Sequence, residues 1–134
     1  MKLKNSINMI PYSKLKGIVA DSFSNLNFNR EPKNLYEPIN YILGIGGKRI
    51  RPILTLAGCN VFSDDIIMAV NPAIAVEIFH NFTLVHDDIM DKADLRRGNE
   101  TIHKKWDNNI AILSGDAMTI IAYQYLVSSE PKHL

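Results

Sequence analysis

The sequence is poor in two features that place many small proteins in a functional class: cysteine and an excess of charge of one sign. Its single cysteine, Cys59, excludes an intramolecular disulfide framework and favours a reducing compartment, so we expect a cytoplasmic protein. Its 15 basic and 14 acidic side chains leave a net charge of only +1. This balance gives no electrostatic reason to expect nucleic acid as a partner or attraction to a membrane surface.

The sequence also lacks long apolar runs and the alternating pattern of β-strands. No apolar run approaches the roughly 20 residues of a membrane-spanning helix, so we expect no membrane span. No segment alternates with a period of two residues, and no two-residue hairpin signal separates apolar runs. These absences predict an all-α fold. With 134 residues, of which 46% are hydrophobic, the chain can form a single helical domain, 1–134, with one core.

What the sequence does contain is apolar residues at helical spacing in successive segments. Capping residues and prolines set the expected starts, with Ser13 before the first helix, Ser63 or Asp64 before a short one, Asn71-Pro72 as cap and first position of the next, and Asn108 or Asn109 before the last. The expected helices cover residues 14–28, 34–43, 52–61, a short segment to 70, 71–91, one turn at 101–106, and 110–127. A charged loop is expected at 94–99. The last helix is apolar on nearly every side, so earlier helices, a larger protein or a partner chain must bury it.

The stretch from Phe79 to Arg97 carries the strongest functional signal. Asp87 and Asp91 are four residues apart, which places both carboxylates on one side of a helix. Like charges at this spacing repel each other by about 0.2–0.5 kcal/mol, so a cation should lie between them. Either a divalent metal or a surface lysine or arginine would supply it. Oxygen ligands suit Mg²⁺, and two carboxylates make half a site that a phosphate-bearing substrate would complete.

Two basic segments accompany these acids. In GGKRIRP, Gly46 and Gly47 allow an anion to approach the backbone, and Lys48 and Arg51 would face the same way if the turn is helical. A solvated basic loop is the alternative. The second segment is the arginine pair at 96 and 97, which either binds an anion or neutralises the nearby acids.

Taken together, GGKRIRP, HNFTLVHDDIMD and RRG, followed by Gly115-Asp116, resemble the trans-isoprenyl diphosphate synthases, or polyprenyl synthetases. The resemblance covers about residues 43–123 and is closest to the farnesyl and geranylgeranyl diphosphate synthases. It implies a helical bundle of the isoprenoid synthase type, usually a homodimer, of which this chain would be the N-terminal half. It also implies a prenyltransferase that condenses isopentenyl diphosphate with an allylic diphosphate to give a short- or medium-chain polyprenyl diphosphate, C15–C20.

The resemblance assigns roles to individual residues. Asp87 and Asp91 would bind Mg²⁺, and Asp88, which lies about 100° away on the helix, ranks lower. Arg96 would hold the allylic diphosphate. The residues that would bind isopentenyl diphosphate are Lys48, Arg51, His80 and Arg97. The residues that would set product length are Phe82, as a bulky floor, and Thr83, as a small lining residue.

One feature of the family is absent from the sequence. The family has a second aspartate-rich motif, whereas the only acidic residue after Asp116 is Glu130. We therefore expect that this chain alone cannot turn over substrate. The same absence would fit a noncatalytic or regulatory subunit that pairs with a full-length synthase. An HD-type metal phosphohydrolase would need a further histidine well before His86, and a class I terpene cyclase would not carry GGKRIRP.

Overall fold

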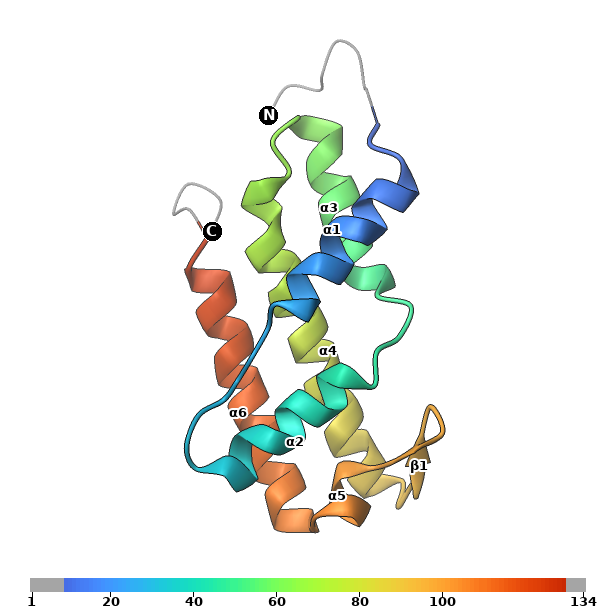
Figure 1. Cartoon of the computed structure of the whole chain (residues 1–134), viewed down its shortest axis with the longest axis vertical. Coiled ribbons are helices and arrows are strands. Elements are labelled where there is room, and N and C mark those ends of the chain that lie inside the picture. The colour runs from blue at the N-terminus through green and yellow to red at the C-terminus, as the bar shows by residue number, and fades with distance from the viewer. Residues whose placement is uncertain (1–8, 130–134) are drawn as a thin grey trace. The chain divides into compact units, whose positions relative to one another are not determined.

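The computed structural model describes residues 9–129, and these are largely helical (Figure 1). The elements are α1 (Tyr12–Ser24), α2 (Lys33–Gly44), α3 (Ile50–Phe62), a 3₁₀ turn η1 (Ile67–Ala69), α4 (Val70–Met90), β1 (Leu95–Arg96), β2 (Asn99–Glu100), α5 (Ile102–Lys105) and α6 (Asn108–Val127). The all-α expectation is confirmed. The residues form two compact units, so the expected single domain stays a prediction.

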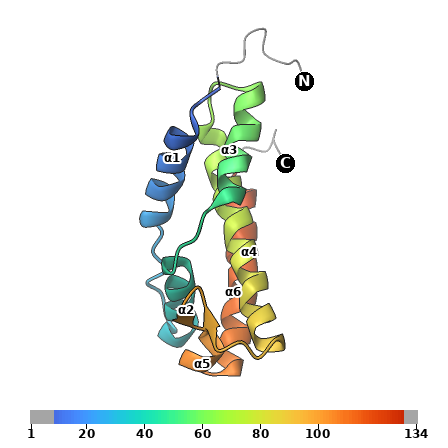
Figure 2. The same cartoon turned by 90° about the vertical axis from the view of Figure 1, so that its right-hand side faces the viewer.

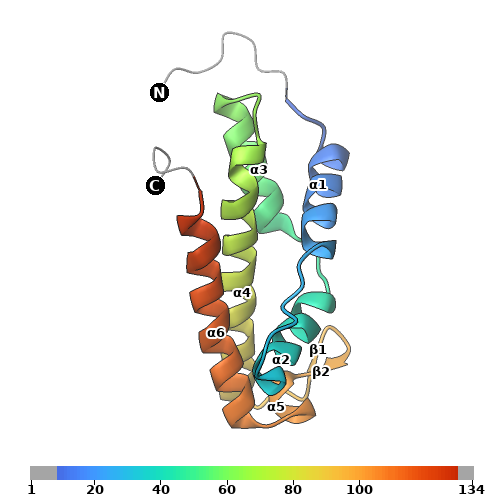
Figure 3. The same cartoon turned by 60° about the vertical axis from the view of Figure 1, so that its left-hand side comes forward.

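The first unit contains residues 1–26, 48–77 and 123–134, of which 9–26, 48–77 and 123–129 are described. In this unit α1 packs against α3 (Figures 1 and 3). Its core is built from aliphatic residues of α1, α3, η1 and the start of α4, namely Leu15, Val19, Ile53, Leu56, Ile66, Ala69 and Ala73. The buried Asn60 accepts a hydrogen bond from the Ile10 N–H (2.7 Å) and so fixes the entry to α1 against the end of α3.

The second unit contains residues 27–47 and 78–122. The parts of α4 and α6 in this unit lie side by side (Figures 1 and 3). The β1–β2 ribbon lies beside α2, where the Tyr41 hydroxyl donates to the Glu100 carbonyl at 2.9 Å (Figure 2). The buried Ser114 hydroxyl of α6 donates to the Leu35 carbonyl at 3.0 Å. These two hydrogen bonds connect α2 to the ribbon and to α6.

Four expected helix starts are wrong. The short helix expected after Ser63 or Asp64 is instead the 3₁₀ turn η1, which follows Ile66 and has no side-chain cap. The residue before α1 is Pro11 rather than Ser13, and its side chain makes no cap. The helix α4 begins at Val70, which places Asn71-Pro72 inside its first turn rather than at its cap. At α6 the Asp107 carboxylate accepts a hydrogen bond from the Ile110 N–H (2.7 Å), so Asp107 rather than either asparagine caps the helix. A carboxylate at this position also interacts favourably with the helix dipole.

The segment expected as a charged loop after Asp94 contains a short antiparallel ribbon instead. Leu95 pairs with Glu100, and the two central residues Arg97 and Gly98 both have positive φ, 53° and 78°. Positive φ at both central positions is typical of a type I′ hairpin turn. The signal in the sequence was Gly98 at the second turn position. It was missed because the residues on either side of the turn are mostly polar and do not show the alternating apolar pattern of strands.

The helix α6 is less buried than its composition predicts. Within residues 108–127 one set of large apolar side chains stays exposed in this chain, namely Ile112, Leu113, Ile120, Tyr123, Leu126 and Val127. By length and composition alone, the segments Ile67–Met90 and Asn108–Val127 could each cross a membrane, a test that core helices of water-soluble proteins also pass. The expected lack of a membrane span is therefore not confirmed and stays a prediction.

Candidate functional site

The C-terminal end of α4 carries the two acids at the centre of the predicted site. The Asp91 N–H donates to the Asp87 carbonyl at 2.8 Å, so the two residues lie one helical turn apart, as the sequence predicts. Lys92 then takes the left-handed conformation (φ 53°), and the Ala93 N–H donates to the Asp88 carbonyl at 2.9 Å, which closes the helix in a Schellman motif. Both Asp87 and Asp91 are exposed.

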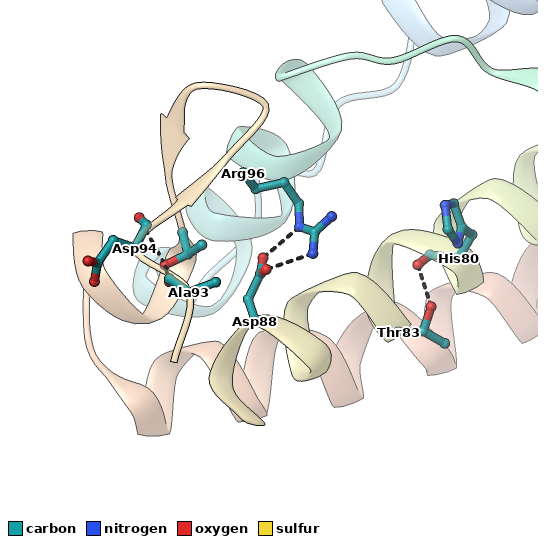
Figure 4. A network of polar contacts seen from close by, with 7 residues as sticks. His80, Thr83, Asp88, Ala93, Asp94 and Arg96 are labelled. Carbon is teal, nitrogen blue, oxygen red and sulfur yellow. Dashed lines mark hydrogen bonds and ion pairs between the residues drawn. The ribbon is translucent and has the colours of Figure 1, made fainter. Parts of the chain in front are cut away.

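The buried acid of this motif is Asp88, between the two exposed ones. Its side chain is only 3% exposed, and both of its oxygens accept hydrogen bonds from Arg96 (Figure 4). The Arg96 Nε–Oδ2 distance is 2.8 Å and the Nη2–Oδ1 distance is 2.7 Å. This hydrogen-bonded pair raises the pKa of Arg96, an effect that burial opposes and that the charges of Asp87 and Asp91 reinforce. Arg96 is therefore held at the end of α4 in its charged form.

Replacement of Asp88 with alanine should lower the free energy of unfolding by about 2 kcal/mol, because it leaves the half-buried guanidinium of Arg96 without its partner. Urea denaturation of the two chains measures this difference. Asp94→Ala is the matched control, because the Asp94–Lys104 ion pair (2.8 Å) is exposed and should contribute little. Equal stability of the Asp88 and Asp94 variants would contradict a structural role for the Asp88–Arg96 pair.

The other residues assigned to this helix lie further from its end. The Thr83 hydroxyl donates to the His80 carbonyl at 2.7 Å (Figure 4). The Phe82 ring packs edge-on against His86, with ring centroids 4.8 Å apart, and also contacts Phe79 at 5.3 Å. Phe82 thus belongs to an aromatic row on α4, and Thr83 is the small, half-buried residue next to it.

The glycine of the Gly115-Asp116 pair in α6 has a role in packing. A β-carbon built on this buried glycine would collide with the imidazole of His86. The His86 ring therefore lies directly against the α6 backbone, where its Nε2 is 3.2 Å from the Ile112 carbonyl oxygen. Gly115 allows α4 and α6 to approach closely in the residues just before Asp87.

The basic residues of GGKRIRP lie at the start of α3, in the first unit. Lys48 and Arg51 are both exposed. Lys48 precedes the helix, which begins at Ile50, and Arg49 between them has a left-handed backbone (φ 49°). The helical turn on which Lys48 and Arg51 would have faced the same way is therefore not present.

An ion pair that the sequence did not predict lies next to this segment. The Arg49 Nη1 is 2.9 Å from the Glu77 Oε1, and the two side chains are only 13% and 3% exposed. The guanidinium carbon of Arg49 also lies 4.4 Å from the centre of the Phe23 ring. The available signal was Glu77 itself, an acid within an otherwise apolar stretch of α4, because a buried carboxylate requires a partner.

The described acids can supply part of a magnesium site but not a closed one. Among residues 9–129, no group of three or more histidine, cysteine, aspartate or glutamate side chains is close enough to hold a metal ion. The exposed carboxylates of Asp87 and Asp91 are hard oxygen donors on one turn, and they lie at the negative end of the α4 dipole. Because Mg²⁺ commonly takes one or two protein carboxylates and fills its other positions with water and phosphate, this donor set fits the ion.

Comparison with known proteins gives a consistent result. The polyprenyl synthetase family profile matches residues 32–134. The geranylgeranyl pyrophosphate synthase of Geoglobus acetivorans is 41% identical over 113 residues, which cover 84% of this chain and 35% of that protein. The crystal structure of a geranylgeranyl pyrophosphate synthase superposes with a TM-score of 0.86 at 50% identity, covering 92% of this chain and 38% of the other. The corresponding Pyrococcus horikoshii structure gives a TM-score of 0.80 at 35% identity, covering 90% and 38%.

These relatives are much longer than this chain. The chain matches little more than a third of each of them, in their N-terminal part. The expectation of an N-terminal portion of an isoprenoid synthase fold is confirmed. The larger part of each relative has no counterpart in these 134 residues.

Proposed function

Because the chain belongs to the polyprenyl synthetase family, we propose that it is the N-terminal part of a prenyltransferase that joins isopentenyl diphosphate to an allylic diphosphate. The observation that carries this proposal is the end of α4, where exposed Asp87 and Asp91 flank an Arg96 anchored on Asp88. Acids for a metal and, through Asp88, an arginine for an anion meet at the end of α4, which is the combination that a metal-bound diphosphate requires.

Arg96 can hold a diphosphate without releasing Asp88. A guanidinium carries five N–H donors, and Asp88 takes only the one on Nε and one on Nη2. The two N–H groups on Nη1 and the second N–H group on Nη2 remain available to bind phosphate oxygens. We propose that Asp88 is a positioning residue that orients this fork, rather than a metal ligand, because its side chain is only 3% exposed and both of its oxygens are bound by Arg96.

The proposed reaction is ionisation followed by carbon–carbon bond formation. The allylic carbon–oxygen bond breaks, the diphosphate leaves with the bonding electrons, and the isopentenyl double bond attacks the allylic carbon before a proton is lost. Mg²⁺ bound by Asp87 and Asp91 would stabilise the negative charge of the leaving diphosphate. Arg96 contributes to the same stabilisation from the protein side. We propose Lys48, Arg51, His80 and Arg97 as the groups that orient isopentenyl diphosphate.

A chimera can test this proposal. Residues 1–134 would be joined to the remaining C-terminal part of the Geoglobus acetivorans relative, and purified protein would be assayed with radiolabelled isopentenyl diphosphate and an allylic diphosphate. We expect Mg²⁺-dependent elongation to a C20 product from the chimera and none from the 134-residue chain alone. A folded, inactive chimera would contradict the proposed activity, whereas product from the short chain would contradict only its expected inactivity. A homodimeric state and a cytoplasmic location remain part of the proposal.

The same chimera tests the residues proposed to set product length. Phe82→Ala removes a bulky ring next to the small Thr83 and should lengthen the main product by at least one isoprene unit. Phe23→Ala is the control, because that ring lies beside Arg49 in the first unit and should leave product length unchanged. Chromatography of the dephosphorylated products measures the difference. Unchanged product length in the Phe82 variant would remove this residue as the floor.

A further inference from the structure

Gly47 and Arg97 are fifty residues apart in the sequence and lie against each other in the second unit. A β-carbon built on Gly47 would lie 2.5 Å from Nη1 and 2.8 Å from Cζ of Arg97. The guanidinium of Arg97 therefore fills the space that any side chain at position 47 would need. The neighbouring Gly46 differs, because its β-carbon would meet nothing within 4 Å.

The rest of the second unit explains why Arg97 reaches this place. Arg97 is the first residue of the two-residue turn of the ribbon, and the preceding Arg96 is bound to Asp88 through two hydrogen bonds. The opposite strand is held to α2 by the hydrogen bond from Tyr41 to Glu100. The ribbon is thus anchored on both strands, which holds the backbone of Arg97 in place, so a side chain at position 47 would move the guanidinium rather than the ribbon.

The guanidinium of Arg97 remains available to an anion. Within residues 9–129 its side chain makes no hydrogen bond or ion pair, although its carbonyl accepts a hydrogen bond from Asn99. The side chain is exposed. Contact with a glycine backbone fixes the position of the group without using its N–H donors, which can then bind phosphate oxygens.

We propose that Gly47 is a positioning residue for diphosphate binding, because the absence of a β-carbon lets the Arg97 guanidinium lie against the backbone of Gly47. A side chain at position 47 would displace the guanidinium and weaken diphosphate binding while the charge of Arg97 is retained. This inference rests on the proposed function, since it names the means by which one of its anion-binding groups is held.

The test compares alanine at the two adjacent glycines. Both have positive φ, 79° at Gly46 and 148° at Gly47, so both substitutions strain the backbone, but only Gly47→Ala meets Arg97. Calorimetric titration of the purified chain with inorganic pyrophosphate in the presence of Mg²⁺ gives the affinities. We expect about tenfold weaker binding for Gly47→Ala and for Arg97→Ala, and less than about threefold weaker binding for Gly46→Ala.

The double variant shows whether Gly47 acts through Arg97. Gly47→Ala with Arg97→Ala should bind pyrophosphate no more weakly than Arg97→Ala alone, because the group that position 47 displaces is already absent. If Gly47→Ala does not fold, the double variant should fold, since the collision is removed. Multiplied losses in the double variant, equal losses at the two glycines, or a double variant that also fails to fold would each overturn the inference and leave the proposed function intact. An absence of pyrophosphate binding by the unmodified chain would instead contradict the proposed function and this inference with it.

Discussion

Replacement of Asp87 with alanine should weaken Mg²⁺-dependent pyrophosphate binding by about 100-fold, the largest binding effect that we expect from a single substitution. The reason is that Asp87 and Asp91 supply the only carboxylates proposed for the metal, so the variant loses one of two protein ligands. Calorimetric titration of the purified chain with pyrophosphate, with and without Mg²⁺, measures the effect. The free energy of unfolding should change by less than about 1 kcal/mol, because the side chain is exposed.

Asp87 and Asp91 lie at the C-terminal end of a helix, where the surrounding backbone already favours a cation. The last carbonyl groups of α4 carry partial negative charge, and two further carboxylates one turn apart add to it. Such an arrangement costs some stability in the absence of a cation. A bound divalent ion would offset this repulsion. Arg96 alone can offset only part of it, because two of its N–H groups are already bound to Asp88.

Asp21→Ala is the matched control for charge. Asp21 is also an exposed helical aspartate, but it lies on α1 in the first unit and is not part of the candidate site. The substitution changes the net charge by the same amount and should leave binding within about twofold, because an exposed aspartate that supplies no proposed ligand acts only through screened charge. Equal losses in the Asp87 and Asp21 variants would show that bulk charge, rather than metal ligation, governs binding.

Replacement of Arg49 with alanine should have the largest effect on stability, lowering the free energy of unfolding by about 3 kcal/mol. Glu77 lies on α4 with its side chain only 3% exposed, so removal of Arg49 deprives a buried carboxylate of the cation 2.9 Å away. The variant also loses the contact between this guanidinium and the Phe23 ring. Urea denaturation followed by circular dichroism measures the change, with the slope of the transition expected to stay constant.

Two variants separate the buried charge from other causes. Arg51→Ala removes an exposed arginine only two residues away and should cost less than about 0.5 kcal/mol. Arg49→Met combined with Glu77→Leu replaces both charges by apolar side chains and should restore most of the stability lost in Arg49→Ala. If the double variant is no more stable than the single one, the loss comes from packing rather than from an uncompensated charge.

The sequence by itself determined the features that depend on neighbours a few residues apart. Helical periodicity predicted the all-α class and the placement of Asp87 and Asp91 on one turn, because residues four apart on a helix lie on the same side. The spacing of GGKRIRP and the aspartate motif indicated the family, which the comparisons confirm. Exact helix starts were less certain, because several residues near α1 and α6 could each have served as the cap.

Only the tertiary structure decided which polar groups meet across the chain. It pairs Arg49 with Glu77, binds Arg96 to Asp88 through both oxygens, and brings Arg97 against Gly47. The pattern of a single helix cannot give these contacts, because they depend on how the elements pack and on which atoms lose contact with water. Burial distinguishes Asp88 from the exposed Asp87 and Asp91, and the buried carboxylate accepts both of its hydrogen bonds from Arg96.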